Sequence, residues 1–485
     1  MTATRQVRRK LRKALKRGAF RTADLFAGCG GFSLGFQRAG FRNVLAIEAD
    51  EDAFTSHVLN FSQLSQPDAY RAFNDIRDVP PARAVKHLCS ARVRTQDAID
   101  ILIGGPPCQA FSLLGRAALW GLARRKHAHA EDPRANLYEY FLEYVRALRP
   151  IAFVMENVRE IGKFNDGNLA EDIASISARL GYNTRYALLN AAYYGVPQYR
   201  ERMFIIGIHD GLDLIPGFPP ATHQCVPPRG YASSRVGMGK ALPIRAPHES
   251  YVDFLPFGGR LSRKRFAVTP TALEALADLP RLTYHLNGAG QRDASDMQGY
   301  NRRVTNFGTL MRSWPDFASG YKTDGHVVRL TPRDYRLFRQ MKPGDMYPQA
   351  AQIAEANYLR RLHATESRLH KRLDSRSRGV LRAEMVPPYD VDKYPNKYRK
   401  MSGDEPAHTV PAHLGKDCYS HIHFDSAQAR TISVREAARL QSFPDGFILC
   451  GGMNARFTQI GNAVPPLLAY AVARHLLRQL RSVLA

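Results

Sequence analysis

Cys108 is the residue of this sequence best suited to act as a nucleophile. It follows Gly104-Gly105-Pro106-Pro107, directly after an apolar run typical of a strand. Two prolines fix the backbone and remove its N–H donors, so this cysteine is expected on a rigid loop at the edge of a sheet. The alternative is a small buried hydrophobic side chain, which is what we expect for Cys89, Cys418 and Cys450.

An acid and two arginines stand beside other apolar runs. Glu156 lies in the tetrapeptide MENV at the end of one run, and Arg200 and Arg202 lie in QYRER at the start of another. A partly buried carboxyl group can donate a proton to a ring nitrogen, and a guanidinium group offers a planar pair of donors to a carbonyl. Taken singly, each of these residues is equally well explained as a solvated residue at a strand end.

A glycine-rich turn follows the first apolar run, in the sequence DLFAGCGGF. Gly28, Gly30 and Gly31 remove side chains, so the backbone can pass close to a ligand, and the helix that follows adds the positive end of its dipole. The pattern G-x-G-x-x-G of a pyrophosphate site is absent. Glu48 ends the next run, where an acid can accept both ribose hydroxyls of a nucleoside cofactor. A tight turn beside an exposed acid is the alternative.

Cys108, Glu156 and Arg202 together have the chemistry of cytosine-5 methylation. The C5 atom of a pyrimidine does not attack an electrophile unaided. When a thiolate adds to C6 and N3 is protonated, C5 becomes an enamine carbon that can accept a methyl group.

These residues are positioned by short apolar runs that alternate with helical periodicity between residues 21 and 208. Strands are predicted at residues 22–27, 43–49, 98–105, 151–157 and 202–208, and helices at residues 136–148 and 169–180. This alternation predicts an α/β fold with a mostly parallel sheet covered on both faces. Ligands of such sheets bind at the carboxyl ends of the strands, where Glu48, Cys108 and Glu156 are predicted to lie.

Six motifs, in this order, resemble those of the DNA (cytosine-5) methyltransferases of the bacterial restriction-modification type. The match covers residues 21–208 and 430–485. The motifs are DLFAGCGG, GGPPCQAFS, MENV, QYRER, RTISVREAARLQSFPD at residues 430–445, and GNAVPP at residues 461–466.

The resemblance implies a Rossmann-like S-adenosylmethionine-dependent methyltransferase domain and a role for each matching residue. Cys108 would be the nucleophile, Glu156 would bind the cytosine N3 and exocyclic amine, and Arg202 would hold O2 with Arg200 assisting the loop. The cofactor S-adenosylmethionine would bind with its ribose at Glu48 and its adenine at Asp75 and Ile76. The other residues against it would be Phe26, Gly28, Cys29, Gly30, Gly31, Gly105, Pro107, Leu137, Asn462 and Val464. Ala49 stands where relatives often have an aromatic residue, so part of the adenine stacking is expected to come from elsewhere.

Four parts of the chain are predicted. Residues 1–20 form a basic arm that contacts DNA or a frayed solvated end, and the frayed end is slightly favoured. Residues 21–208 form the catalytic and cofactor-binding domain. Residues 209–430 form a DNA-recognition domain, because they are rich in Pro, Gly, Arg and Tyr and are too long for a loop. Its candidate DNA contacts are GRLSRKR at 259–265 and GYNRR at 299–303. Residues 431–485 return to the catalytic domain and end in a helix.

Charge and composition favour duplex DNA as the partner. A net charge of +25 attracts a polyanion, although a solvated basic surface is the alternative. The target cytosine would have to be flipped out of the duplex. No segment is apolar enough for a membrane span, and six cysteines without C-x-x-C spacing predict neither a metal site nor a disulfide scaffold. We therefore expect a monomer in the bacterial cytoplasm, associated with the nucleoid, with a possible separately encoded restriction endonuclease.

Other functions stay open at this point. A relative of this family methylates tRNA with the same motifs, and the large middle region argues against that function without excluding it. A catalytically silent DNA-binding protein is disfavoured by the intact set of Cys108, Glu156 and Arg202. A dinucleotide oxidoreductase is weaker still, because the pyrophosphate pattern is absent.

Overall fold

The structure is a computed structural model, and it divides the chain into two compact units. Unit 1 consists of residues 1–269, 448–450 and 463–485, and unit 2 of residues 270–447 and 451–462. The structure describes residues 3–64, 70–90, 93–107, 137–163, 168–225, 266–290, 292–293, 296–416 and 419–483. Cys108 and the stretch GRLSRKR lie outside the described residues.

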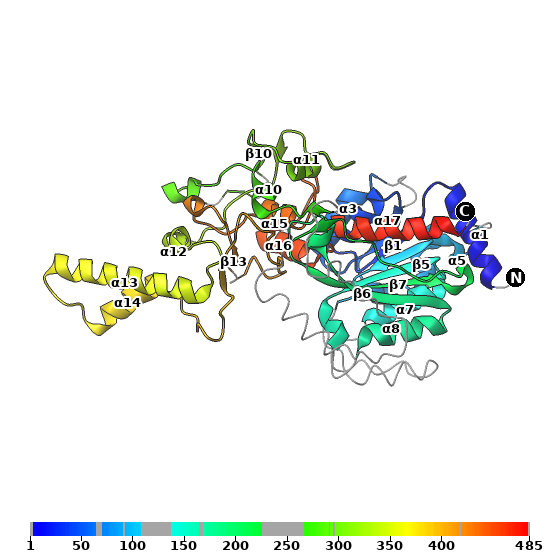
Figure 1. The fold of residues 1–485 in the computed structure, drawn as a ribbon, viewed down its shortest axis with the longest axis horizontal. Helices are drawn as coiled ribbons and strands as arrows, with labels where there is room; N and C mark the ends of the chain where they lie inside the picture. Colours follow the sequence, from blue (N-terminus) through cyan, green and yellow to red (C-terminus); the bar gives the residue numbers. More distant parts are fainter. Residues whose placement is uncertain are drawn as a thin grey trace. The chain divides into compact units, whose positions relative to one another are not determined.

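Unit 1 is built on a seven-stranded sheet with the order β3-β2-β1-β4-β5-β7-β6 (Figure 1). Neighbouring strands from β3 to β5 are parallel, and β7 runs antiparallel to both β5 and β6. The strands are β1 (Arg21–Leu25), β2 (Arg42–Ile47), β3 (Arg71–Phe73), β4 (Ile101–Gly104), β5 (Ala152–Asn157), β6 (Tyr182–Asn190) and β7 (Glu201–His209). The strand order reverses at β1, so the edge beside β1 and β4 is where a ligand of such a sheet binds.

Helices cover both faces of this sheet (Figure 1). Helices α7 and α8 lie on one face, where Phe141 and Val145 pack into an apolar cluster with Leu102 and Phe153 of the strands. Helix α17 lies on the other face and packs against α2 so closely that a Cβ added at Gly35 would lie 2.4 Å from that of Ala469. The helices are α2 (Gly31–Arg38), α3 (Glu51–Phe61), α4 (Pro81–Ala84), α5 (Thr95–Ala98), α7 (Leu137–Leu148), α8 (Leu169–Arg179) and α17 (Pro466–Ser482).

The N-terminal residues form helix α1 (Ala3–Lys16), so the expectation of a frayed end is wrong. Val7, Leu11 and Ala14 are buried because they repeat on one side of the helix, and α1 packs against the turn at Asp210–Leu212. The Lys10 ammonium is also buried and donates hydrogen bonds to three backbone carbonyls, those of Gln96 at 2.6 Å, Arg149 at 2.9 Å and Leu148 at 3.3 Å. Burial lowers the pKa of Lys10 to about 8.

The boundary between the units differs from the one that we predicted at residue 209. The composition changes where the sheet ends, but the chain stays in unit 1 up to Thr269. Two short strands, β8 (His223–Gln224) and β9 (Ala267–Val268), pair in parallel, and Thr269 donates a hydrogen bond to the carbonyl of Ala192 at 2.7 Å. Residues 431–447 and 451–462, which we predicted to rejoin the catalytic domain, belong to unit 2.

Unit 2 contains short helices, small sheets and a helical hairpin (Figure 1). The hairpin is formed by α13 (Tyr347–Leu369) and α14 (Ser375–Met385). The other helices are α10 (Ala272–Leu276), α11 (Asn306–Arg312), α12 (Tyr335–Gln340), α15 (Val434–Leu440) and α16 (Met453–Asn462). Two small sheets pair β10 (Gln298–Gly299) with β11 (Lys322–Thr323) and β12 (Tyr398–Lys400) with β13 (Tyr419–Ile422).

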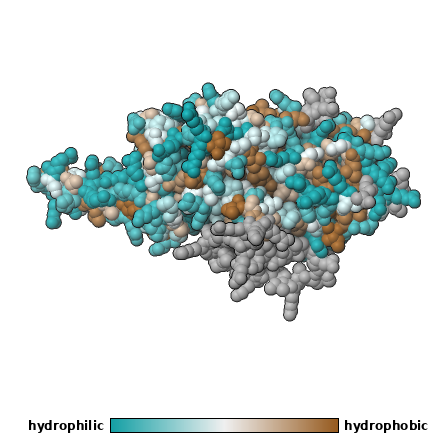
Figure 2. Space-filling model, turned by 45° about the horizontal axis from the view of Figure 1, so that its top comes forward, coloured by the Kyte–Doolittle hydropathy of each residue, from teal (hydrophilic) through white to brown (hydrophobic). Residues whose placement is uncertain are grey.

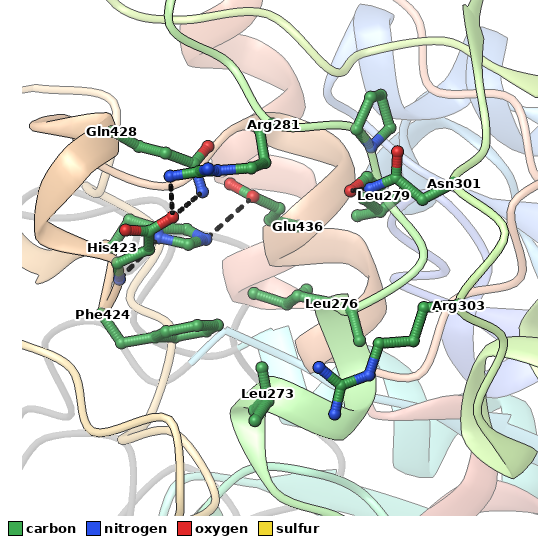
Figure 3. A pocket seen from close by; sticks show the side chains of 13 residues that line it. Leu273, Leu276, Leu279, Arg281, Asn301, Arg303, His423, Phe424, Gln428 and Glu436 are labelled. Carbon is green, nitrogen blue, oxygen red and sulfur yellow. Dashed lines mark hydrogen bonds and ion pairs between the residues drawn. The ribbon is translucent and has the colours of Figure 1, made fainter.

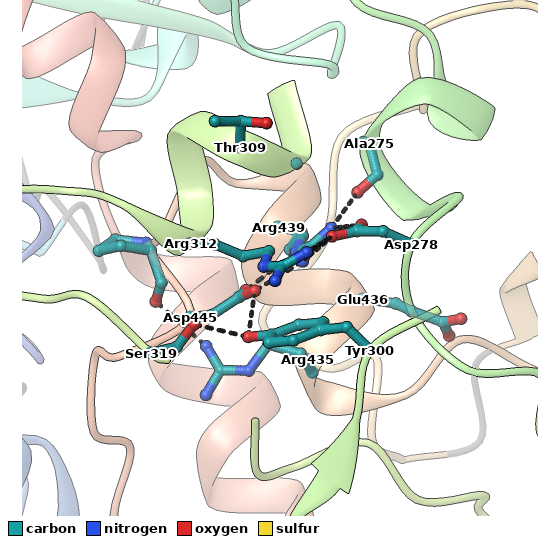
Figure 4. Close-up of polar contacts among 12 residues, drawn as sticks. Ala275, Asp278, Tyr300, Thr309, Arg312, Ser319, Arg435, Glu436, Arg439 and Asp445 are labelled. Carbon is teal, nitrogen blue, oxygen red and sulfur yellow. Dashed lines mark hydrogen bonds and ion pairs between the residues drawn. The ribbon is translucent and has the colours of Figure 1, made fainter. Parts of the chain in front are cut away.

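The charged residues of the motif RTISVREAARLQSFPD form buried ion pairs inside unit 2. Arg439 of α15 is fully buried and is paired with Asp278 and Asp445, whose carboxylate also accepts a hydrogen bond from the Tyr300 hydroxyl at 2.7 Å (Figure 4). Arg430 and Glu436 form a second buried pair at 2.6 Å. Paired in this way, the charges avoid most of the cost of burial, and the motif holds unit 2 together.

Candidate active site

The loop that leads to Cys108 is held between two strands. A Cβ added at Gly104 would lie 2.2 Å from the carbonyl oxygen of Leu25, so only glycine lets β4 approach β1 there. The Asn157 side chain, at the end of β5, donates a hydrogen bond to the carbonyl of Pro106 at 2.9 Å. The loop up to Pro107 is therefore fixed at the carboxyl edge of the sheet, at the position that the sequence predicted.

Glu156 and Arg202 lie together beside this loop. The Glu156 side chain is only 9% exposed, and its Oε1 lies 2.9 Å from Nε of Arg202. These side chains meet because β5 and β7 are adjacent and antiparallel, with Asn157 opposite Met203. A Cβ added at Gly105 would lie 3.1 Å from the other carboxylate oxygen, so the loop and the acid are in close contact.

Burial governs the protonation of Glu156. It raises the pKa of this carboxyl above its ordinary value, while the positive charges of Arg202 and Arg200 oppose the rise. Burial lowers the pKa of Arg202, and the charge of Glu156 opposes that change. A carboxyl group whose pKa is raised in this way keeps its proton to a higher pH than a free carboxyl group does, and it can deliver that proton to a ring nitrogen.

Arg200 has a different position from Arg202. Its side chain is fully buried, and Nη2 donates a hydrogen bond to the carbonyl of Ala463 at 3.1 Å. Its backbone N–H lies 3.3 Å from Oδ1 of Asn190, which accepts the hydrogen bond. Arg200 thus joins the start of β7 to the returning C-terminal segment, directly before Val464.

The glycine-rich turn is bound to the acid that follows the second strand. Oε2 of Glu48 accepts a hydrogen bond from the Gly28 N–H at 2.8 Å, and Oε1 accepts one from the Asp50 N–H at 2.8 Å. Glu48 therefore fixes the loop, and burial raises its pKa. Gly28 has a φ of +55°, and a Cβ added there would have no atom of the described residues within 4 Å.

The turn continues into α2 through residues that only glycine suits. Gly30 has a φ of +106°, and a Cβ there would lie 2.3 Å from Cε2 of Phe61. Gly31 begins α2, and Cys29 is fully buried, which raises the pKa of its thiol. Phe26 also has a positive φ of 60°, which is strained for a residue with a side chain.

A chain of buried polar side chains lies beneath this loop, and our sequence reasoning missed it. The Ser33 hydroxyl donates to Oδ2 of Asp24 at 2.6 Å and accepts a hydrogen bond from the Asn43 amide at 2.7 Å. His57 lies 3.3 Å from the same hydroxyl and 2.8 Å from the hydroxyl of Tyr70. The signal in the sequence was a carboxylate inside an apolar strand, because a buried acid needs partners.

The remaining predicted cofactor residues lie at several places. Asp75 accepts hydrogen bonds from the Arg77 side chain and caps the turn at Ile76–Asp78, and Ile76 is buried. Leu137 begins α7, and Val464 is buried in unit 1. Asn462 ends α16 and belongs to unit 2.

Unit 2 has a cavity of about 370 Å³ that both apolar and charged side chains line (Figure 3). Arg303 lies on the same side as Leu273 and Leu276, and Arg281 lies near Gln428. Arg281 forms an ion pair with Asp425 at 2.9 Å. Arg303, from the stretch GYNRR, is exposed and has no ion pair among the residues that the structure describes.

The described residues contain no group of three or more His, Cys, Asp and Glu side chains that could hold a metal ion. None of their helices is long and apolar enough to cross a bilayer.

The fold and the site together define a Rossmann-like α/β methyltransferase. The family model of the C-5 cytosine-specific DNA methylases matches residues 20–478, and the chain belongs to this family of DNA (cytosine-5) methyltransferases. A protein of Oceanobacillus iheyensis with the provisional name type II methyltransferase M.OihORF3336P is 36% identical over 93% of this chain and 94% of its own length. Type II methyltransferase M.AgeI of Thalassovita gelatinovora is 30% identical over 93% of this chain and 98% of its own.

A solved structure has the same fold. A provisionally assigned DNA modification methyltransferase, encoded within a prophage of E. coli, superimposes with a TM-score of 0.59 and 21% identity over 95% of this chain and 99% of that chain.

Proposed function

We propose that Cys108, Glu156 and Arg202 carry out the methyl transfer to C5 of a cytosine in a specific duplex sequence. The observation that carries this proposal is the contact of Glu156 with both Arg202 and Gly105, three residues before the nucleophile. A cytosine in this site would receive a proton at N3 from Glu156 and donor contacts at O2 from Arg202. The cytosine would reach the site by flipping out of the duplex, at a cost of a few kcal/mol in lost stacking.

The glycine-rich turn fits the cofactor S-adenosylmethionine. A Cβ added at Gly28 would meet no described atom within 4 Å, which leaves room for a nucleoside, and Glu48 is held at the loop with carboxylate oxygens that can accept ribose hydroxyls. Asp75 and Ile76 would lie at the adenine. The rest of the cofactor would lie against Gly105, Pro107, Leu137, Val464 and Asn462. When bound, the cofactor supplies a methyl group on a sulfonium.

The chemical step follows from the protein groups. The Cys108 thiolate forms a bond to C6 while Glu156 protonates N3, and C5 becomes nucleophilic. C5 would then accept the methyl group that bound S-adenosylmethionine would supply, with the thioether sulfur of S-adenosylhomocysteine as the leaving group. The C5 proton passes to solvent, the thiolate leaves C6, and the N3 proton returns to Glu156. Arg200 positions the start of β7 and does not touch the base in this scheme.

Unit 2 would recognise the DNA target. Arg303 supports this assignment because it lines the cavity, is exposed and has no ion pair among the described residues. The type II names of the two relatives favour a partnership with a separately encoded restriction endonuclease. One set of motifs per chain is sufficient for a monomer to act.

The test is methyl transfer from labelled S-adenosylmethionine to duplex DNA and to tRNA, followed by bisulfite sequencing. We expect the wild type to methylate cytosine in one short DNA context. Cys108→Ser should abolish transfer, Glu156→Gln should slow it by about 10²-fold or more, and Cys89→Ser should have no effect. Transfer to tRNA alone would refute the DNA substrate, and full activity of Cys108→Ser would refute the assigned nucleophile.

A further inference from the structure

The distal half of the α13–α14 hairpin stands clear of the core of unit 2 (Figure 1). The buried residues of α13 end at Tyr358, and α14 has none. Tyr347, Ala350, Ala354 and Tyr358 belong to the apolar cluster of unit 2, and the partly buried Leu362, Leu381 and Met385 pack against it. Residues 359–385 therefore form a projection without a fully buried side chain.

This projection is strongly basic. Residues 359–385 contain eight arginine and lysine side chains and three aspartate and glutamate side chains, whereas the whole chain has 69 against 44. Its surface is mainly hydrophilic in the space-filling view (Figure 2). A dense positive charge on an exposed helix pair costs stability through self-repulsion unless an anion offsets it.

Three acids of the hairpin have partners within it, whereas Glu384 is exposed and has no ion pair among the described residues. Glu366 pairs with Arg378 at 2.8 Å and accepts a hydrogen bond from the Leu373 N–H at 2.9 Å, and Glu355 pairs with Arg382 at 3.1 Å. Asp374 caps α14.

Five exposed basic side chains remain without an ion pair or a hydrogen bond. Within the described part of the chain, these are Arg361, Arg368, Lys371, Arg372 and Arg376. Arg361 and Arg368 are seven residues apart, so they lie on one side of α13 at a spacing of about 10.5 Å, close to three base-pair steps.

We propose that the hairpin binds the sugar–phosphate backbone of duplex DNA through Arg361, Arg368 and Arg376. This inference rests on the duplex DNA substrate of the proposed function. Phosphate contacts position a protein without reading sequence, and single exposed arginines suit them. The free part of α13, residues 359–369, is about 16 Å long, so the hairpin would reach phosphates about five base-pair steps away from those at the core of unit 2.

The salt dependence of binding tests this role. We would measure the Kd of the full-length protein for a 30-bp duplex of arbitrary sequence between 50 and 200 mM KCl. The triple variant Arg361→Gln, Arg368→Gln, Arg376→Gln should reduce the slope of log Kd against log[KCl] by up to about 2.7, since each phosphate contact contributes about 0.9. Over this range the wild type would lose up to about 40-fold more affinity than the variant.

Matched variants separate this role from general charge and from misfolding. The triple variant Arg474→Gln, Arg478→Gln, Arg481→Gln removes the same charge from α17 and should keep the wild-type slope. Replacing the three hairpin arginines with lysine should restore the slope, because phosphate contact needs only the charge. An unchanged slope in the hairpin variant, an equal loss in the α17 variant, or no rescue by lysine would each overturn the proposal. DNA methylation at saturating DNA should persist in the hairpin variant, so failure of the proposed function would be seen separately, in the wild type.

Discussion

Asp24→Asn should make the stability of unit 1 less sensitive to pH. Asp24 lies in β1 beneath the glycine-rich turn and is 1% exposed. Burial raises the pKa of its carboxyl from 3.8 to about 7, the hydrogen bond from Ser33 opposes the rise, and the nearby charge of Glu48 adds to it. Asparagine has the same shape, keeps an oxygen that can accept the Ser33 hydrogen bond and carries no titrating proton.

The sign and size of the effect follow from this shift. A carboxyl whose folded-state pKa lies above its unfolded value contributes its full stability below the unfolded pKa. That stability is lost as the pH rises toward the folded pKa. With pKa values of 3.8 unfolded and about 7 folded, the wild type loses about 2.6 kcal/mol between pH 5 and pH 8 from this group. The variant does not lose it.

The assay is urea unfolding of the wild type and the variant at pH 5, 6, 7 and 8, followed by circular dichroism. The difference in unfolding free energy, variant minus wild type, should increase by about 2.6 kcal/mol across this range, with most of the change below pH 7. Glu51→Gln, at an exposed carboxylate in the first turn of α3, is the control and should give a flat difference. A flat difference for Asp24→Asn would show that the carboxylate is ionised in the folded state and would refute the reasoning.

Three other substitutions test the remaining structure. Gly30→Ala should cost about 2 kcal/mol or more and weaken cofactor binding in calorimetry, because the new methyl group meets Phe61. Gly40→Ala is the control. Gly40 has a φ of +93°, and a Cβ added there would meet no described atom within 4 Å, so this variant measures only the cost of a side chain at a positive φ. Arg439→Met should cost about 3–5 kcal/mol in urea unfolding followed by tryptophan fluorescence, since it removes the buried cation that pairs with both Asp278 and Asp445. Replacing both acids with Asn should recover much of this loss. Lys10→Met should lower the thermal midpoint of unfolding, because it removes the donor to three backbone carbonyls at a cost of about 1–3 kcal/mol in stability. If the N-terminal residues were a frayed arm, the midpoint would not change.

The sequence predicted the strands that carry the site because those strands are buried on both faces. Their continuous apolar runs and the glycines and prolines that follow mark where each strand ends, and β1, β2, β4, β5 and β7 lie within two or three residues of the predicted ranges. Strands β3 and β6, at the two edges of the sheet, were missed. None of the three residues of β3 is fully buried, and the first half of β6 is only partly buried at Asn183–Arg185, so neither gives a clear strand pattern.

Charged residues were harder to interpret, because burial of a charge depends on partners that are distant in sequence. The motif around Arg439 pairs with Asp278, which lies 161 residues away, and the basic N-terminal run buries Lys10 against carbonyls more than 85 residues away. A short stretch of sequence around Arg439 or Lys10 therefore does not contain these partners.

The sequence by itself determined the family, the chemistry and the edge of the sheet at which the site lies, because these depend on residue types at short spacing along single loops. The tertiary structure alone decided that Glu156 contacts Arg202 and Gly105, that Glu48 holds the glycine-rich turn, and that Asp24 is buried beneath it. Those contacts join strands that are adjacent in the sheet but separate in the chain, and burial at that depth shifts the protonation on which the chemistry depends.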